Sequence, residues 1–213
     1  MKNGDYYYSD IYMRENLQDL FDCSFKIGDR EKIREQYKTL RSLELSGQTD
    51  FINKAVDISA LTENATAACD ILVSDTGTDF VFCGNDTSPV TGNAKLIMKA
   101  LLNLLSNAYL YGAERLVTTK TIETVSHIKI EVQSGGGAYG GIQYGRGLRF
   151  VRDVCLCHGG NFFVEQSGFS IRAVMLLPKA DCYKEYSQIP DLYSLISDRL
   201  SPVYIELFGM EYH

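Results

Sequence analysis

The chain has 213 residues, of which 45% are hydrophobic, so it can bury a sizeable core as one main domain with smaller appendages. Its formal net charge at pH 7 is −6, which argues against a nucleic-acid partner, because binding to a phosphate backbone needs clustered lysine and arginine. The sequence contains no apolar run of about 18 residues and no signal-peptide core, so we expect no membrane segment and a cytoplasmic protein.

Residues 1–54 predict an N-terminal helical hairpin. Apolar residues recur at helical spacing over residues 10–25 and again over 29–45, with a break at Gly28. The apolar stripe needs a partner, which is either the following domain or a second copy in a four-helix homodimer. The stripe consists of Ile11, Leu17, Leu20, Phe21, Ile33, Tyr37 and Leu40.

Residues 55–178 alternate short strands with helices, in the order β-α-β-α-β-β-α-β-β. This order predicts an α/β protein with a two-layer α/β sandwich, in which helices cover one face of a mixed sheet. Residues 179–213 form a C-terminal extension with one helix at about 191–200. The elements predicted for the main domain are strand 55–58, a helix that Ser59 caps, strand 80–83, a helix over 94–110 that Asn93 caps, strands 116–121 and 127–133, helix 148–157, and strands 162–166 and 170–177.

Two asparagines interrupt the apolar helix 94–110. Asn103 and Asn107 are four residues apart, so both amides project from the same side of the helix, and Tyr111 lies one turn further along. Leucines flank Asn103, and an amide that is buried without partners is unfavourable. The helix therefore either satisfies these amides internally or turns them toward a cavity.

A glycine-rich segment, Gly135–Gly147, follows a strand and leads into a helix. A backbone without Cβ atoms can approach a ligand closely, and the N-terminus of a helix offers unpaired N–H groups to an anion. The segment is an anion site in principle, and its alternative is a flexible linker or a tight turn.

Together, these segments resemble the ATPase domains of the histidine-kinase/Hsp90-like (GHKL) class over about 125 residues. Residues 103–108, Asn-Leu-Leu-Ser-Asn-Ala, resemble the asparagine box of sensor histidine kinases, and residues 145–151, with His158-Gly159-Gly160, resemble the second glycine box and its helix. The resemblance implies a Bergerat-type sandwich with ATP and Mg²⁺ as cofactors.

The resemblance also implies roles for particular residues. In that class the asparagine-box amides hold Mg²⁺ and the triphosphate, which implies a catalytic role for Asn103 and metal binding by Asn107. The ring of Tyr111 would lie near the adenine. The other implied nucleotide contacts are Ser134, Gly136, Gly145, Arg146, Gly147 and Leu148.

The sequence departs from the class in ways that weaken phosphotransfer. Ser134 stands where the first glycine box has an adenine-binding aspartate, and Leu110 stands where a lysine is usual. Only about ten residues, 138–147, are available for a lid, which would exclude water poorly. No histidine occurs in residues 1–54, where the class places its phosphoacceptor.

Three functions are compatible with this pattern. The first is a histidine-kinase-type ATP-binding protein of two-component-type signalling, with weakened or lost phosphotransfer. If active, it is an ATP-dependent protein kinase whose partner is a response regulator or a histidine-bearing chain. The alternatives are a non-catalytic interaction or dimerisation module and an anti-sigma-factor-like serine kinase.

Overall fold

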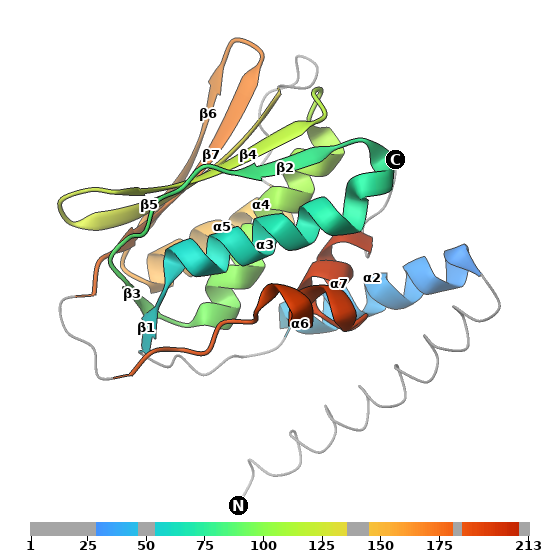
Figure 1. Ribbon diagram of the computed structural model, residues 1–213, viewed down its shortest axis with the longest axis horizontal. Helices are drawn as coiled ribbons and strands as arrows, with labels where there is room; N and C mark the ends of the chain where they lie inside the picture. Colours follow the sequence, from blue (N-terminus) through green and yellow to red (C-terminus); the bar gives the residue numbers. More distant parts are fainter. Residues whose placement is uncertain (1–28, 47–53, 136–144, 181–184, 209–213) are drawn as a thin grey trace, which may run out of the picture. The chain divides into compact units, whose positions relative to one another are not determined.

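The structure is a computed structural model that describes residues 29–46, 54–135, 145–180 and 185–208 (Figure 1). The chain divides into a larger compact unit, Gln48–Val203, and a smaller one, made of Met1–Gly47 and Tyr204–His213. The first helix of the predicted hairpin, residues 10–25, lies outside the described residues. No helix in the described part of the chain is long and apolar enough to span a membrane.

The larger unit carries every strand of the described residues. Its elements in chain order are β1 (Lys54–Val56), α3 (Ile58–Val73), a short 3-10 helix (Ser74–Thr76), β2 (Asp79–Phe82), β3 (Val90–Gly92), α4 (Ala94–Tyr111), β4 (Leu116–Glu123), β5 (His127–Gly135), α5 (Arg146–Cys157), β6 (Asn161–Ser167), β7 (Ser170–Pro178) and α6 (Leu192–Ser197).

A mixed five-stranded sheet has the order β2-β4-β5-β7-β6, in which β2 is parallel to β4 and the other neighbours are antiparallel. Helices α3, α4 and α5 lie together on one face of this sheet (Figure 1). The predicted two-layer sandwich is therefore confirmed. Its physical reason is that each helix has one apolar side, which is buried when it packs on the apolar face of the sheet.

The core lies between these two layers. Alternation along β5 turns Ile128, Ile130 and Val132 toward the helices, and all three are buried. The facing helices contribute a second set of buried apolar side chains, which includes Leu61, Ala65, Ile97, Leu101, Leu105, Val151 and Val154.

Two local features differ from the sequence-based expectation. Asp57, and not Ser59, caps α3, because the Asp57 carboxylate accepts a hydrogen bond from the Ala60 N–H at 3.0 Å. The Ser59 hydroxyl is buried in the first turn and donates to the Asn85 carbonyl at 2.8 Å. Strand β3 was not predicted, because three residues are too few to show a period-two pattern. It pairs with β1 as a separate two-stranded antiparallel sheet.

The first part of the C-terminal extension packs on the larger unit. The Ala55 N–H donates to the Glu185 carbonyl at 2.9 Å, and the Ser187 N–H donates to the Ala55 carbonyl at 2.7 Å. The Asn64 amide of α3 donates to the Pro190 carbonyl at 3.0 Å, and α6 contacts α3. Residues 185–203 thus belong to the larger unit, and the domain boundary at residue 178 stays a prediction.

In the smaller unit, α2 (Arg30–Ser46) carries the second half of the predicted apolar stripe. The buried Tyr37 ring stacks on the Tyr204 ring at 6.5 Å between centroids and lies 6.1 Å from the Phe208 ring. Both partners belong to α7 (Pro202–Phe208). This part of the stripe is therefore covered by the chain's own C-terminal helix, and the homodimer through the predicted hairpin stays a prediction.

Candidate functional site

The helix that carries the two asparagines begins at a cap that the sequence predicted. The Asn93 side chain accepts hydrogen bonds from the Lys95 N–H at 3.0 Å and the Leu96 N–H at 3.2 Å, which satisfies two of the unpaired donors at the start of α4. Leucine and alanine dominate the helix as far as Tyr111, and both favour helical backbone.

The two asparagine amides have different environments. Asn103 is only 1% exposed, and its Nδ2 donates to the Lys99 carbonyl at 3.0 Å. Asn107 is half-buried, and within the described part of the chain its amide forms no hydrogen bond. Because Asn107 is partly exposed and makes no internal hydrogen bond, it is the amide of this helix that is best placed to bind something else.

The first turn of α5 lies directly over both amides. A Cβ atom at Gly147 would lie 2.7 Å from Asn103 Oδ1 and 3.9 Å from Asn107 Nδ2. Since the first of these distances is shorter than normal contact, a larger residue at position 147 would displace the Asn103 amide. The structure therefore brings together Asn103, Asn107 and Gly147, three residues that the sequence assigned to one site.

The N-terminus of α5 has no side-chain cap. Gly145 occupies the cap position. Glycine has no side-chain oxygen that could accept hydrogen bonds from the N–H groups of Arg146, Gly147 and Leu148. These three N–H groups have no hydrogen-bond partner among the described residues. These unpaired donors and the positive end of the helix dipole thus lie beside the asparagine amides.

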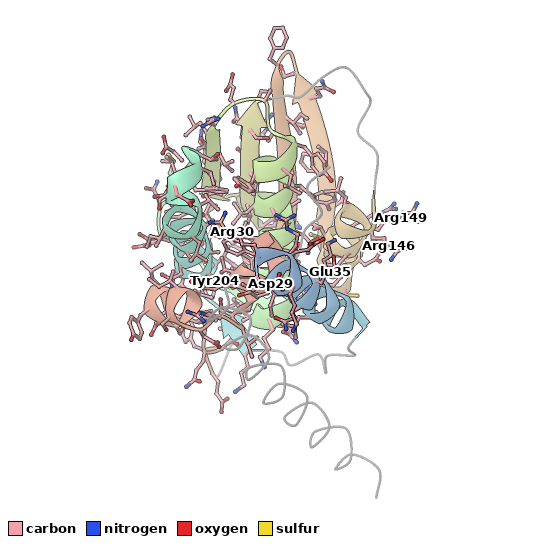
Figure 2. The ribbon with its side chains drawn as sticks, turned by 90° about the vertical axis from the view of Figure 1, so that its right-hand side faces the viewer. Asp29, Arg30, Glu35, Arg146, Arg149 and Tyr204 are labelled. Atoms are coloured by element: carbon pink, nitrogen blue, oxygen red, sulfur yellow. The ribbon has the colours of Figure 1, made fainter. Side chains whose placement is uncertain are left out.

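The remaining predicted site residues are more dispersed. Ser134 is 8% exposed and lies beside the end of α4, where a Cβ at Gly112 would be 3.4 Å from the Ser134 Cβ. Tyr111 is 62% exposed, and Arg146 points outward from the start of α5 (Figure 2). Gly136 lies outside the described residues.

An open pocket of about 220 Å³ lies near Ser134, and its lining includes Glu114, Gly135 and Phe169 but neither Asn103 nor Asn107. The pocket therefore does not include the two asparagine amides beside Gly147. Among the described residues, no group of three or more histidine, cysteine, aspartate or glutamate side chains is arranged to hold a metal ion.

Sequence reasoning missed one cation near the site. Lys99 lies one turn before Asn103 on α4, and its ammonium group lies 5.8 Å from the centre of the Phe150 ring on α5. The i, i+4 spacing of Lys99 and Asn103 is the signal that would have revealed it. Lys99 adds a positive charge to the contact between α4 and α5.

His158 links the two helices of the site. Its Nδ1–H donates to the Val154 carbonyl at 2.7 Å, and its Nε2 accepts from the Asn93 N–H at 3.0 Å, so the ring is held in the neutral form. A Cβ atom at Gly92 would lie 2.5 Å from His158 Nε2, so a glycine is needed there. Burial lowers the pKa of His158, and the hydrogen bond to Val154 opposes part of that shift.

The lowered pKa of His158 predicts that the protein becomes less stable in acid. Because the pKa of His158 is lower in the folded state than in the unfolded chain, the unfolded chain binds more protons, and folding stability is lost as the pH falls below about 6.5. We expect His158→Gln, which cannot titrate, to show a smaller loss of unfolding free energy between neutral and mildly acidic pH than the unmodified protein. Urea unfolding followed by circular dichroism measures the difference. His127→Gln is the control, and an unchanged pH dependence in His158→Gln would refute this role.

Scans against protein-family models and curated proteins find no match for this sequence. Solved structures do match it. The nucleotide-free catalytic domain of histidine kinase ThkA has 18% identity and a TM-score of 0.53, and the match covers 62% of this chain and 98% of that domain. The ATP-binding domain of PrrB from Mycobacterium tuberculosis has 23% identity and a TM-score of 0.52, with 61% and 98% covered.

A longer match is histidine kinase ThkA in complex with the response regulator protein TrrA. It has 16% identity and a TM-score of 0.57, and it covers 83% of this chain and 62% of that one. At these identities the likeness establishes the fold. The chain has the α/β sandwich of histidine-kinase ATP-binding domains, which is the fold that its asparagine and glycine boxes predicted.

Proposed function

We propose that this chain is a histidine-kinase-type ATP-binding protein of two-component-type signalling that binds Mg²⁺·ATP weakly. The observation that carries the proposal is the position of Gly147 against the amides of Asn103 and Asn107, beside the free N–H groups of α5. The fold shared with the ATP-binding domain of PrrB supports the same class of ligand.

The residues present fit the phosphate end of the nucleotide. Mg²⁺ prefers oxygen ligands and keeps several waters, so the Oδ1 atom of Asn107 suits it together with phosphate oxygens. The N–H groups of Arg146, Gly147 and Leu148 suit the phosphates. The buried Asn103 would hold this arrangement in place. Phosphoryl transfer depends chiefly on the alignment of the reacting groups and on electrostatic stabilisation of the phosphates.

The residues fit the base end less well. The Ser134 hydroxyl has no hydrogen-bond partner in the described structure and can accept one from adenine, but it lacks the charge of an aspartate. Leu110 carries no positive charge that could bind the phosphates. The charges of Arg146, Arg149 and Lys99 replace it only in part. The two losses together weaken binding by about 2–4 kcal/mol, or a factor of about 30 to 1,000 in Kd.

The phosphoacceptor is expected on another chain. Of the described histidines, His158 is buried between two helices, and His127 lies at the start of β5 with its Nδ1 2.8 Å from the Ser126 hydroxyl. His158 bonds to Asn93, which lies at the opposite end of α4 from Asn107. The complex of ThkA with TrrA supports a response regulator as one class of partner, and a histidine-bearing chain is the other.

A second candidate function is a non-catalytic interaction module that keeps the sandwich and no longer uses nucleotide. Ser134 and Leu110 favour it, because both replace charged groups at the same site. Calorimetric titration with Mg²⁺ and ATP separates the two functions. Weak binding supports the first, and no heat of binding at millimolar ATP supports the second.

A further prediction concerns selectivity between the adenine and guanine bases of ATP and GTP. We expect ATP and GTP to bind the unmodified protein with similar affinity, because the remaining contacts reach the metal and the phosphates and do not read the base. Ser134→Asp restores an acceptor for the adenine amino group and should favour ATP over GTP by about tenfold. Ser134→Ala is the matched control and should change the ATP affinity by less than about 1 kcal/mol. Tight, ATP-selective binding by the unmodified protein would contradict this account.

A further inference from the structure

The outer side of α5 carries three exposed arginines. Arg146, Arg149 and Arg152 recur every three residues on the side opposite the buried Val151 and Val154. Figure 2 shows Arg146 and Arg149 pointing away from the sheet. None of the three forms an ion pair with any described residue. We call these three arginines the arginine face.

The arginine face is not needed for folding. The opposite side of α5 already packs on the sheet, and three neighbouring positive charges repel one another. The one carboxylate on this side of the helix, Asp153, forms no ion pair in the described structure. The face is therefore available to a partner of opposite charge.

The chemistry of the face indicates an acidic protein partner. All basic side chains of α5 are arginines, whose planar group binds carboxylates through two parallel hydrogen bonds and is enriched at protein interfaces. Leu156 is 50% exposed on the same side, one turn beyond Arg152, and offers an apolar contact. A nucleic acid is less suitable, because binding to a phosphate backbone needs a larger cluster of lysine and arginine than these three side chains provide.

We propose that the arginine face, with Leu156, docks an acidic segment of a partner protein. From Arg146 to Leu156 the helix is about 15 Å long, which matches about three helical turns of a partner. Carboxylates of that segment pair with the arginines, and an apolar side chain contacts Leu156. The surface begins at the N-terminus of α5, so a segment bound there would lie close to the site of Asn107.

Fluorescence anisotropy tests this docking with a labelled peptide of glutamate and leucine at low ionic strength. Binding should weaken about fivefold or more in Arg149→Gln/Arg152→Gln, since each exposed arginine–carboxylate pair that is lost contributes modestly to the affinity. The control Arg115→Gln/Lys120→Gln makes the same change in net charge around β4 and should keep the affinity. Leu156→Ser should weaken binding without changing its dependence on salt.

The outcomes that overturn the proposal are distinct. Equal losses of peptide affinity in the Arg149→Gln/Arg152→Gln and Arg115→Gln/Lys120→Gln variants would mean that the peptide responds only to the net charge of the protein. Equally tight binding of a single-stranded DNA of the same length would indicate a general anion surface. Arg152→Gln should leave Mg²⁺·ATP affinity unchanged, because Arg152 lies beyond the first turn of α5. A failure of the nucleotide titration therefore leaves the docking test intact, and a failure of docking leaves the proposed nucleotide site intact.

Discussion

Replacing Asn107 by alanine is expected to lower the affinity for Mg²⁺·ATP by about 100-fold, because it removes an oxygen ligand that neighbouring side chains do not replace. The amide forms no hydrogen bond within the described structure and is only half-buried. The folded state therefore loses little, and the thermal midpoint should stay nearly constant. Calorimetric titration with Mg²⁺ present, and again with a chelator, measures the metal-dependent part of the binding.

The controls for Asn107 separate binding from folding. Asn64→Ala changes a half-buried asparagine of α3 that donates to Pro190, and it should leave nucleotide affinity unchanged. Asn107→Asp keeps the shape but adds a negative charge beside the phosphates, so it should also weaken binding. Asn103→Ala is a poorer probe, because the buried amide donates to the Lys99 carbonyl and its loss also destabilises the fold by about 1–3 kcal/mol. Equal affinity in Asn107→Ala and the unmodified protein would remove Asn107 from the site.

The largest expected effect on stability comes from Gly160→Ala. A Cβ atom at Gly160 would overlap the carbonyl oxygen of Leu176 and lie 2.9 Å from its carbonyl carbon. Both are backbone atoms of β7, which pairs with β5 and β6, so the strand cannot move aside without losing ladder hydrogen bonds. We expect the free energy of unfolding to fall by about 2–4 kcal/mol, as measured by urea denaturation.

The matched control lies at the other end of α5. A Cβ atom at Gly145 would meet no atom within 4 Å, and its φ of −67° suits any residue. Gly145→Ala should therefore cost less than Gly160→Ala, about 1 kcal/mol or less, because the cap position favours glycine over alanine but has room for a Cβ atom. If both alanine variants unfold at the same urea concentration, the close approach of Gly160 to β7 does not hold in solution.

Much of the fold followed from local sequence signals. Alternation along β5 and the helical spacing of α4 each involve residues within one element, so the sequence alone predicted their type and buried side. The Asn93 cap was also predictable, because a cap bonds to N–H groups two and three residues ahead. The asparagine box and the glycine box are short, contiguous stretches of sequence. They therefore predicted the correct class of fold without knowledge of the tertiary structure.

The sequence by itself therefore determined the α/β class, the order of the main elements and the common side of Asn103 and Asn107 on their helix. Only the tertiary structure decided that Gly147 lies on those amides, that His158 bonds to Asn93, and that the C-terminal extension packs on β1. Each of these contacts joins residues that are dozens of positions apart. Such contacts depend on how the helices and sheet pack around a shared core, and periodicity within one element carries no information about that packing.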